Sequence, residues 1–276
     1  MALTGRISLL RSSLNKHPMT IRTLPFSHFH SLLRAALLFA AVFSATADDR
    51  RFAFVYPAVT SPKGEIELEN TVTWQHRLGD ESKFDAFQFR HSVEIGVTDH
   101  FQLELYPANW SYSTDIHSAR YDESAVEAIY NLTNPTTDWI GSAVYLEIAG
   151  GERAFDIEGK LLLQKNLGPL TIGYNAILDA AWEGDSFGHF DSRNGSFSQT
   201  LGVSYDLTKR VSVGAELVHE IALPGWRASE PSVVYAGPNA SFRFGRGYVT
   251  VAGVFQLTNV QAEPELQTRV IFGVSF

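Results

Sequence analysis

From residue 64 to the end of the chain, apolar and polar residues alternate with a period of two. In the first segment Ile66 and Leu68 alternate with Glu65, Glu67 and Glu69. Successive side chains of a β-strand point to opposite faces, so this period predicts a strand with one apolar and one charged face. No long segment places apolar residues at helical spacing, and we therefore expect an all-β protein.

The alternation recurs often enough to predict about twelve strands. The first two fall at about 64–77 and 84–97, and the others at 100–112, 121–133, 139–150, 154–166, 169–183, 196–207, 210–221, 232–245, 247–258 and 266–276. Even strand numbers are typical of outer-membrane barrels. A soluble β-sandwich also alternates apolar and polar faces, so further signals have to decide between the two.

The connections between these strands alternate in length. Tight ones are expected at 98–99, 133–138, 166–168, 208–209 and 245–246, and mostly longer ones at 78–83, 113–120, 151–153, 184–195, 222–231 and 259–265, of which 151–153 is the short exception. Short turns on one side and long loops on the other are typical of an antiparallel up-and-down barrel in the bacterial outer membrane, with both termini in the periplasm.

The last strand carries a second signal, because Val270, Phe272, Val274 and the terminal Phe276 recur at every second position. This ending resembles the C-terminal signature of bacterial outer-membrane barrels. The resemblance implies that the four residues act as an assembly signal read by the barrel-assembly machinery.

Aromatic residues are predicted at two levels along the strands. With the first strand running outward, one set falls near the extracellular ends and the other near the periplasmic ends: Trp74, Phe87, Trp182 and Phe197, and Phe101, Tyr130, Tyr205, Phe244 and Phe276. Aromatic rings collect at both interfaces of a membrane. Trp110 does not have the outward phase, and it follows Pro107, which breaks a strand or marks a bulge.

Residues 1–47 differ from the rest, with five Lys or Arg and no acidic residue. An apolar run from Ala35 to Phe43 ends at Ala45-Thr46-Ala47, the pattern that signal peptidase reads, before Asp48. The run is too short for the roughly 20 residues of a membrane-spanning helix. We expect a signal peptide at 1–47, with Met19 as an alternative start, a periplasmic lead-in at 48–63 and the barrel at 64–276.

Composition narrows the class further. Without the leader, 22 minus 5, or 17, basic residues face 30 acidic ones, which argues against a nucleic-acid partner. The chain has no Cys, which excludes a lipoprotein anchor, disulfides and thiolate metal sites.

Three short elements carry a resemblance to a known group. Thr60-Ser61-Pro62-Lys63-Gly64 followed by Glu alternating with apolar residues, the hairpin from Glu94 to Asp99, and the C-terminal strand resemble an uncharacterised family of predicted porin-like or transporter-like outer-membrane barrels. The resemblance implies a barrel and leaves the solute open. It brings no catalytic residues.

Strand parity predicts an acidic lumen. The inward positions include Glu65, Glu67, Glu69, Arg90, Glu94, Glu104, Glu127, Glu147, Glu158, Lys160, Asp179, Glu216, Arg243 and Arg269. Arg90 is expected diagonally beside Glu69, and closure of the barrel brings Arg269 to the other side of the first strand. Such charges either line a pore or pair with one another as a plug.

Little in the chain points to enzymatic or metal chemistry. No P-loop, nucleotide-binding glycine motif or H-E-x-x-H motif occurs. Asp185, His189 and Asp191 share one predicted outer loop, where a solvated acidic loop is favoured over a metal site. We expect no metal and no cofactor.

Asn70 and His91 interrupt the apolar outward face, and they stand opposite each other if Trp74 stands opposite Phe87. Outer-membrane phospholipases place an Asn, a His and a Ser on the outside of a twelve-stranded barrel, so a lipid-modifying enzyme is an alternative. The nucleophile is missing, since Ser92 has inward parity.

The function favoured by the sequence is a passive channel or transport protein for small solutes in the bacterial outer membrane. The alternatives are the phospholipase-like enzyme and a structural or adhesive barrel. The expected partners are outer-membrane lipid and lipopolysaccharide, the assembly machinery and a small solute of unknown identity.

Overall fold

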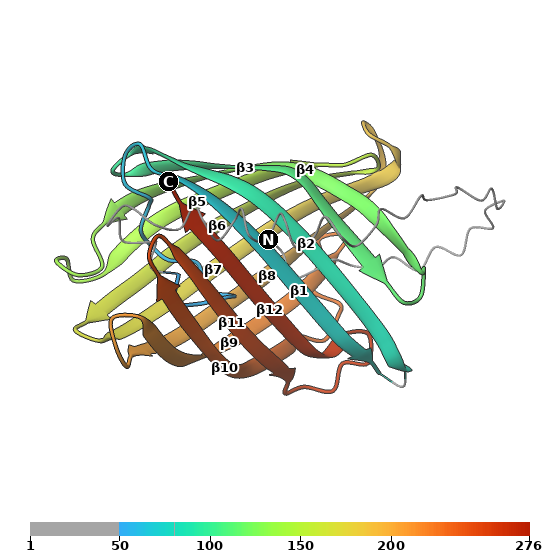
Figure 1. Ribbon diagram of the computed structural model, residues 1–276. Coiled ribbons are helices and arrows are strands. Elements are labelled where there is room, and N and C mark those ends of the chain that lie inside the picture. The colour runs from blue at the N-terminus through green and yellow to red at the C-terminus, as the bar shows by residue number, and fades with distance from the viewer. Residues whose placement is uncertain (1–49, 80) are drawn as a thin grey trace, which may run out of the picture.

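The computed structural model describes residues 50–79 and 81–276, which form a closed antiparallel barrel (Figure 1). Each strand pairs with its neighbours in sequence, and β1 closes the barrel by pairing with β12. This confirms the all-β, twelve-stranded barrel. The expected signal peptide, the Met19 start and the cleavage site before Asp48 lie outside the described residues. In the part of the chain described, no helix is long and apolar enough to cross a membrane.

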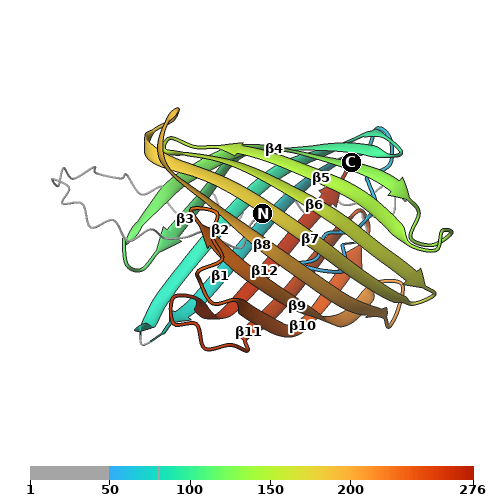
Figure 2. The same cartoon turned by 180° about the vertical axis from the view of Figure 1, so that it is seen from behind.

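The strands follow the predicted alternation closely. Their bounds are β1 Ile66–Leu78, β2 Glu81–Thr98, β3 Phe101–Ser113, β4 Ser118–Thr133, β5 Gly141–Gly150, β6 Ala154–Leu167, β7 Leu170–Ser186, β8 His189–Asp206, β9 Val211–Pro224, β10 Val233–Phe244, β11 Gly247–Gln256 and β12 Pro264–Ser275. Figure 2 shows the wall formed by β4 to β8 from behind.

The buried and exposed positions alternate along the strands, as in the β5 pattern from Gly141 to Gly150. Outward residues such as Leu146, Ile148 and Leu178 are apolar and exposed, whereas inward residues such as Glu147 are buried. An apolar outer surface around a polar interior is the arrangement of a barrel surrounded by lipid.

Three of the outer connections are shorter than the expected loops. The segment expected as a loop at 184–195 lies almost entirely in β7 and β8, which are joined by two residues. The connection expected at 78–83 is a tight one between β1 and β2, and that expected at 113–120 is reduced to 114–117 between β3 and β4. The residues of the 184–195 segment, including Gly184, Asn194 and Gly195, show no alternation of apolar and polar side chains. A hairpin that extends beyond the lipid has water on both faces, so it can form strands without that pattern.

The phase of β3 changes at Pro107, where the pairing with β2 and β4 is irregular. This bulge turns Trp110 outward, so that it stacks on Phe89 with ring centroids 3.9 Å apart. Trp74 also stacks on Phe87. Trp110 therefore belongs to the outer aromatic level from which the simple alternation excluded it, because the bulge inserts a residue into the strand.

Candidate functional site

The lumen of the barrel is the candidate site, and its periplasmic half is occupied by the chain itself. Residues 50–62, which we call the plug, precede β1 and include Phe52, Phe54 and Ala58, all buried. The sequence suggested a periplasmic lead-in for 48–63, but the structure places the plug inside the barrel. In Figure 1 this blue segment lies within the barrel at the end where β12 finishes.

Side chains of the barrel wall satisfy the backbone of the plug. The Glu216 carboxylate accepts hydrogen bonds from the amides of Ala53, Phe54 and Val55 at 2.8, 2.6 and 3.0 Å. Asn175 accepts from the Tyr56 amide at 2.7 Å and donates to its carbonyl at 3.0 Å, which imitates a strand pairing. These inward polar side chains therefore provide what a neighbouring strand would provide.

The same pattern continues along the rest of the plug. Gln164 accepts from the Ala58 amide at 3.0 Å, and Asn131 donates to the Ala58 carbonyl at 2.6 Å. Gln102 accepts from the amide of Ser61 at 2.9 Å. Because a buried backbone group without a partner is costly, these amide side chains hold the plug in one path across the lumen.

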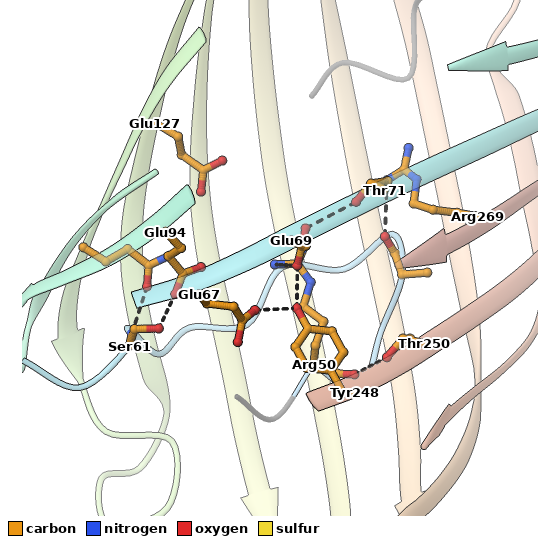
Figure 3. Close-up of polar contacts among 12 residues, drawn as sticks. Arg50, Ser61, Glu67, Glu69, Thr71, Glu94, Glu127, Tyr248, Thr250 and Arg269 are labelled. Atoms are coloured by element: carbon orange, nitrogen blue, oxygen red, sulfur yellow. Dashed lines mark hydrogen bonds and ion pairs between the residues drawn. The ribbon is translucent and has the colours of Figure 1, made fainter. Parts of the chain in front are cut away.

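The glutamates at the start of β1 contact the plug and β11 (Figure 3). The Tyr248 hydroxyl lies within hydrogen-bond distance of both carboxylates, 2.8 Å from Glu67 and 2.6 Å from Glu69, so its one proton is shared between them. Arg50 of the plug forms an ion pair with Glu69 at 3.7 Å. Ser61 donates to Glu94 on β2. These carboxylates therefore help to anchor the plug.

The two arginines expected to flank these glutamates bind elsewhere. Arg90 reaches Glu147 on β5 at 2.6 Å. Arg269 donates to Thr73 at 3.0 Å and to the Ala53 carbonyl at 3.2 Å. The expected register is confirmed, since Arg90 stands diagonally beside Glu69 and Arg269 stands opposite Thr73 on β1. The long Arg90 side chain nevertheless reaches a carboxylate on another strand.

The strand register brings seven acidic residues into one continuous row on adjacent strands. Each stands directly opposite the next, and together we call them the carboxylate belt: Glu67, Glu94, Glu104, Glu127, Glu147, Glu158 and Asp179 on β1 to β7. Glu67 lies at the periplasmic start of β1, whereas Asp179 lies well along β7. Because barrel strands are tilted, the belt rises around the wall toward the extracellular side.

The upper end of the belt opens into a cavity of about 570 Å³ in the extracellular half of the lumen, which we call the outer cavity. Small side chains, among them Ala86, Ala149 and Ala181, leave this space. Ten acidic and three basic residues line it: Asp122, Glu123, Glu147, Glu152, Asp156, Glu158, Asp179, Glu183, Asp185 and Asp191, and Arg90, Arg120 and Arg153. The outer cavity is therefore strongly acidic.

A chain of contacts joins the plug to the outer cavity. The Tyr56 ring packs edge-on against Tyr145 with centroids 5.2 Å apart. The Tyr145 phenol donates to Glu147 at 2.8 Å, and Glu147 in turn pairs with Arg90. Lys160 lies 3.7 Å from the centroids of both tyrosine rings and forms an ion pair with Glu158 at 2.9 Å. The groups below the cavity are thus packed on the plug.

Comparison with protein families identifies the chain. The model of DUF6662, a family of unknown function, matches residues 44–263. The chain belongs to DUF6662. The matched region includes both the plug and most of the barrel. No curated protein matches the sequence.

Solved structures show which fold this DUF6662 chain shares. The COG4313 outer membrane channel from Pseudomonas putida F1 has a TM-score of 0.56 and 13% identity, covering 79% of this chain and 98% of that one. The NanC porin has a TM-score of 0.51 and 10% identity, covering 76% of this chain and 98% of that one. The translocator domain of the autotransporter NalP from Neisseria meningitidis has a TM-score of 0.51 and 12% identity, covering 90% of this chain and 96% of that one. The fold is that of outer-membrane porins and channels.

Most of the predicted lumen residues are buried inside the barrel. They are Glu67, Glu69, Arg90, Glu94, Glu104, Glu127, Glu147, Glu158, Lys160, Asp179, Glu216 and Arg269. Glu65 and Arg243 lie at the periplasmic rim and are half-buried. Arg243 shares Asp206 with Arg51, at 3.1 and 2.8 Å. The plug itself had no counterpart among the predicted site residues.

The outward pair forms as expected, with Asn70 opposite His91. Asn70 Oδ1 lies 2.7 Å from His91 Nδ1, and the Trp110 indole donates to His91 Nε2 at 3.1 Å. Both ring nitrogens are therefore engaged, and no serine is hydrogen-bonded to His91 among the described residues. The geometry lends no support to a Ser-His nucleophile here. Asp185, near the end of β7, forms an ion pair at 3.3 Å with Arg153 in the connection between β5 and β6.

Proposed function

We propose that the protein is a passive outer-membrane channel for small solutes whose acidic lumen favours cations over anions. The observation that carries this proposal is the outer cavity, in which ten acidic residues face three basic ones. A lumen lined by one sign of charge raises the local concentration of counter-ions. The plug restricts the periplasmic half, so we expect low conductance.

The balance of charge in the outer cavity persists after pairing. Its three basic residues are each committed to one acid, Arg90 to Glu147, Arg120 to Asp122 and Arg153 to Asp185. Glu123 and Glu183 also line the cavity, and neither forms an ion pair with a described residue. A cation entering from outside therefore meets a net attraction, and an anion a net repulsion.

Single-channel recording of the refolded chain beginning at Asp48 tests the proposal. We expect small conductance steps and, in a potassium chloride gradient, a reversal potential that shows preference for potassium. The preference should fade with salt, because the screening length falls from about 10 Å at 0.1 M to about 3 Å at 1 M. Anion preference, or silence even after removal of the plug, contradicts the proposal.

Charge-neutralising variants connect the selectivity to the outer cavity. Glu123→Gln with Glu183→Gln should reduce the potassium preference, since both residues line the cavity. The matched control is Asp115→Asn with Glu230→Gln, which removes two charges from exposed outer connections. Equal effects of the two pairs would assign the selectivity to overall charge and not to the cavity.

A further inference from the structure

One acidic group in the wall of the outer cavity is buried without a matching cation. Asp179 on β7 is only 6% exposed and lines the cavity. No described residue forms a hydrogen bond or ion pair with its carboxylate. Its direct cross-strand neighbours are Glu158 on β6 and Ser196 on β8, so the closest charge in the register is another acid.

Nearby basic side chains are already engaged. Lys160 Nζ lies 2.9 Å from Glu158 and also contacts the rings of Tyr56 and Tyr145. Arg90 is held by Glu147. A buried carboxylate is stable only when it is paired or hydrogen-bonded. The described wall supplies no donor to Asp179, so a donor has to come from the outer cavity.

A second carboxylate faces the same space. Asp156 on β6 lines the cavity and stands opposite Ala181, two residues beyond Asp179, so the two acids are diagonal neighbours. The backbone positions of diagonal neighbours on adjacent strands are ~7–8 Å apart, and their Cβ atoms are somewhat closer. The residues directly opposite Asp156 are Ala149 and Ala181, whose small side chains leave the carboxylate accessible from the cavity.

From this geometry we infer that the outer cavity holds a binding site for a small organic cation with two N–H-bearing ends, such as a diamine, between Asp156 and Asp179. A Ca²⁺ ion takes about 6–8 oxygen ligands, and these two carboxylates provide four, whereas each carboxylate can accept hydrogen bonds from one ammonium end of a diamine. A cavity of about 570 Å³ lies in the usual range for small-molecule sites. The inference rests on the proposed function for its role as the solute site of the channel.

Binding is measured on the refolded full barrel in detergent by isothermal titration calorimetry with 1,4-diaminobutane. 1,4-Butanediol, which has the same carbon chain and no charge, is the ligand control. We expect the diamine to bind and the diol not to bind. Asp179→Asn and Asp156→Asn should each weaken binding by about 10- to 100-fold, the loss of one charge-assisted hydrogen bond.

The matched protein control is Asp115→Asn, which removes one acid from an exposed connection outside the cavity, and should bind as the unmodified protein does. Heat-modifiable gel mobility verifies that each variant is folded. No diamine binding, tighter binding of Mg²⁺ or Ca²⁺ than of the diamine, or an Asp179→Asn variant with unchanged affinity overturns the site.

Conductance separates this inference from the proposed function. Diamine binding that depends on Asp179 in a barrel that never conducts supports the site and refutes the channel. Conduction with cation preference but no diamine binding supports the channel and refutes the site. Block of the current by diamine added on the extracellular side, lost in Asp179→Asn, supports both.

Discussion

Gly173 on β7 stands directly opposite Gly202 on β8, and both face the plug. A Cβ at Gly202 would lie 2.6 Å from the Phe52 ring, and one at Gly173 would lie 2.9 Å from a methyl carbon of Val55. The two glycines therefore form a recess for these plug side chains. The plug is fitted to the wall by shape as well as by hydrogen bonds.

Gly202→Ala should loosen the plug, because overpacking costs about 1–3 kcal/mol. The chain has no cysteine, so Ala53→Cys in the buried plug provides a unique reporter. We expect about tenfold faster labelling by a water-soluble maleimide when Gly202→Ala is added. Gly159→Ala is the control, since its Cβ would meet nothing within 4 Å. Equal labelling rates in all three proteins would show that the recess does not hold the plug.

Glu216→Gln should raise the conductance or the open probability of single channels. The carboxylate accepts three plug amides and the Asn239 side chain, and each charge-assisted bond contributes about 1.5–3 kcal/mol. A glutamine side chain has only one acceptor oxygen, and its NH₂ group would face the N–H groups of the plug, which are also donors. Glu230→Gln in an exposed loop is the control. A chain beginning at Gly64 sets the conductance expected without a plug, and a current in Glu216→Gln no larger than that of the unmodified protein argues against plug control.

Deletion of Phe276 should lower the amount of folded barrel in the outer membrane while synthesis and export continue. Its backbone amide donates to the Ile66 carbonyl at 2.8 Å, at the junction of β12 with β1. Its exposed ring also completes the apolar alternation of the last strand. Heat-modifiable protein in outer-membrane fractions measures the effect. Phe242→Ala removes another exposed ring on β10 and should assemble normally; the same loss in both would remove the case for a terminal signal.

Purified protein should release no fatty acid from phospholipid in calcium, before or after His91→Ala. His91 Nε2 accepts the Trp110 indole and is not free to activate a hydroxyl. The substitution should instead cost about 1 kcal/mol per lost hydrogen bond in stability, read from the temperature at which heat-modifiable mobility changes. Fatty-acid release that disappears with His91→Ala would establish the enzyme alternative.

The wall of the barrel was predictable because lipid outside and polar groups inside impose the same period on every strand. Asn70 opposite His91 followed from Trp74 opposite Phe87, since register propagates along a hairpin. Trp110 was not predictable from that period, because the bulge at Pro107 shifts the phase.

The plug was not predictable in the same way, since its Pro-broken sequence has no period and its backbone pairs with side chains. A signal existed in the strands that receive it. Asn175, Gln164 and Gln102 are inward amides that can both donate and accept, and Gly173 faces Gly202 at an inward pair. Amides and paired glycines on the inner face indicate that another segment of backbone lies against them.

The carboxylate belt occupies β1 to β7 only. On β8 to β12 the buried inward residues are mostly uncharged, with Glu216 and Glu220 as the acids and Arg269 as a base. The interior is thus electrically lopsided, with a field directed across the barrel as well as along it. A cation in the outer cavity would therefore be drawn sideways toward β5, β6 and β7, where the upper end of the belt lines the cavity, whereas a neutral solute would experience no such lateral pull.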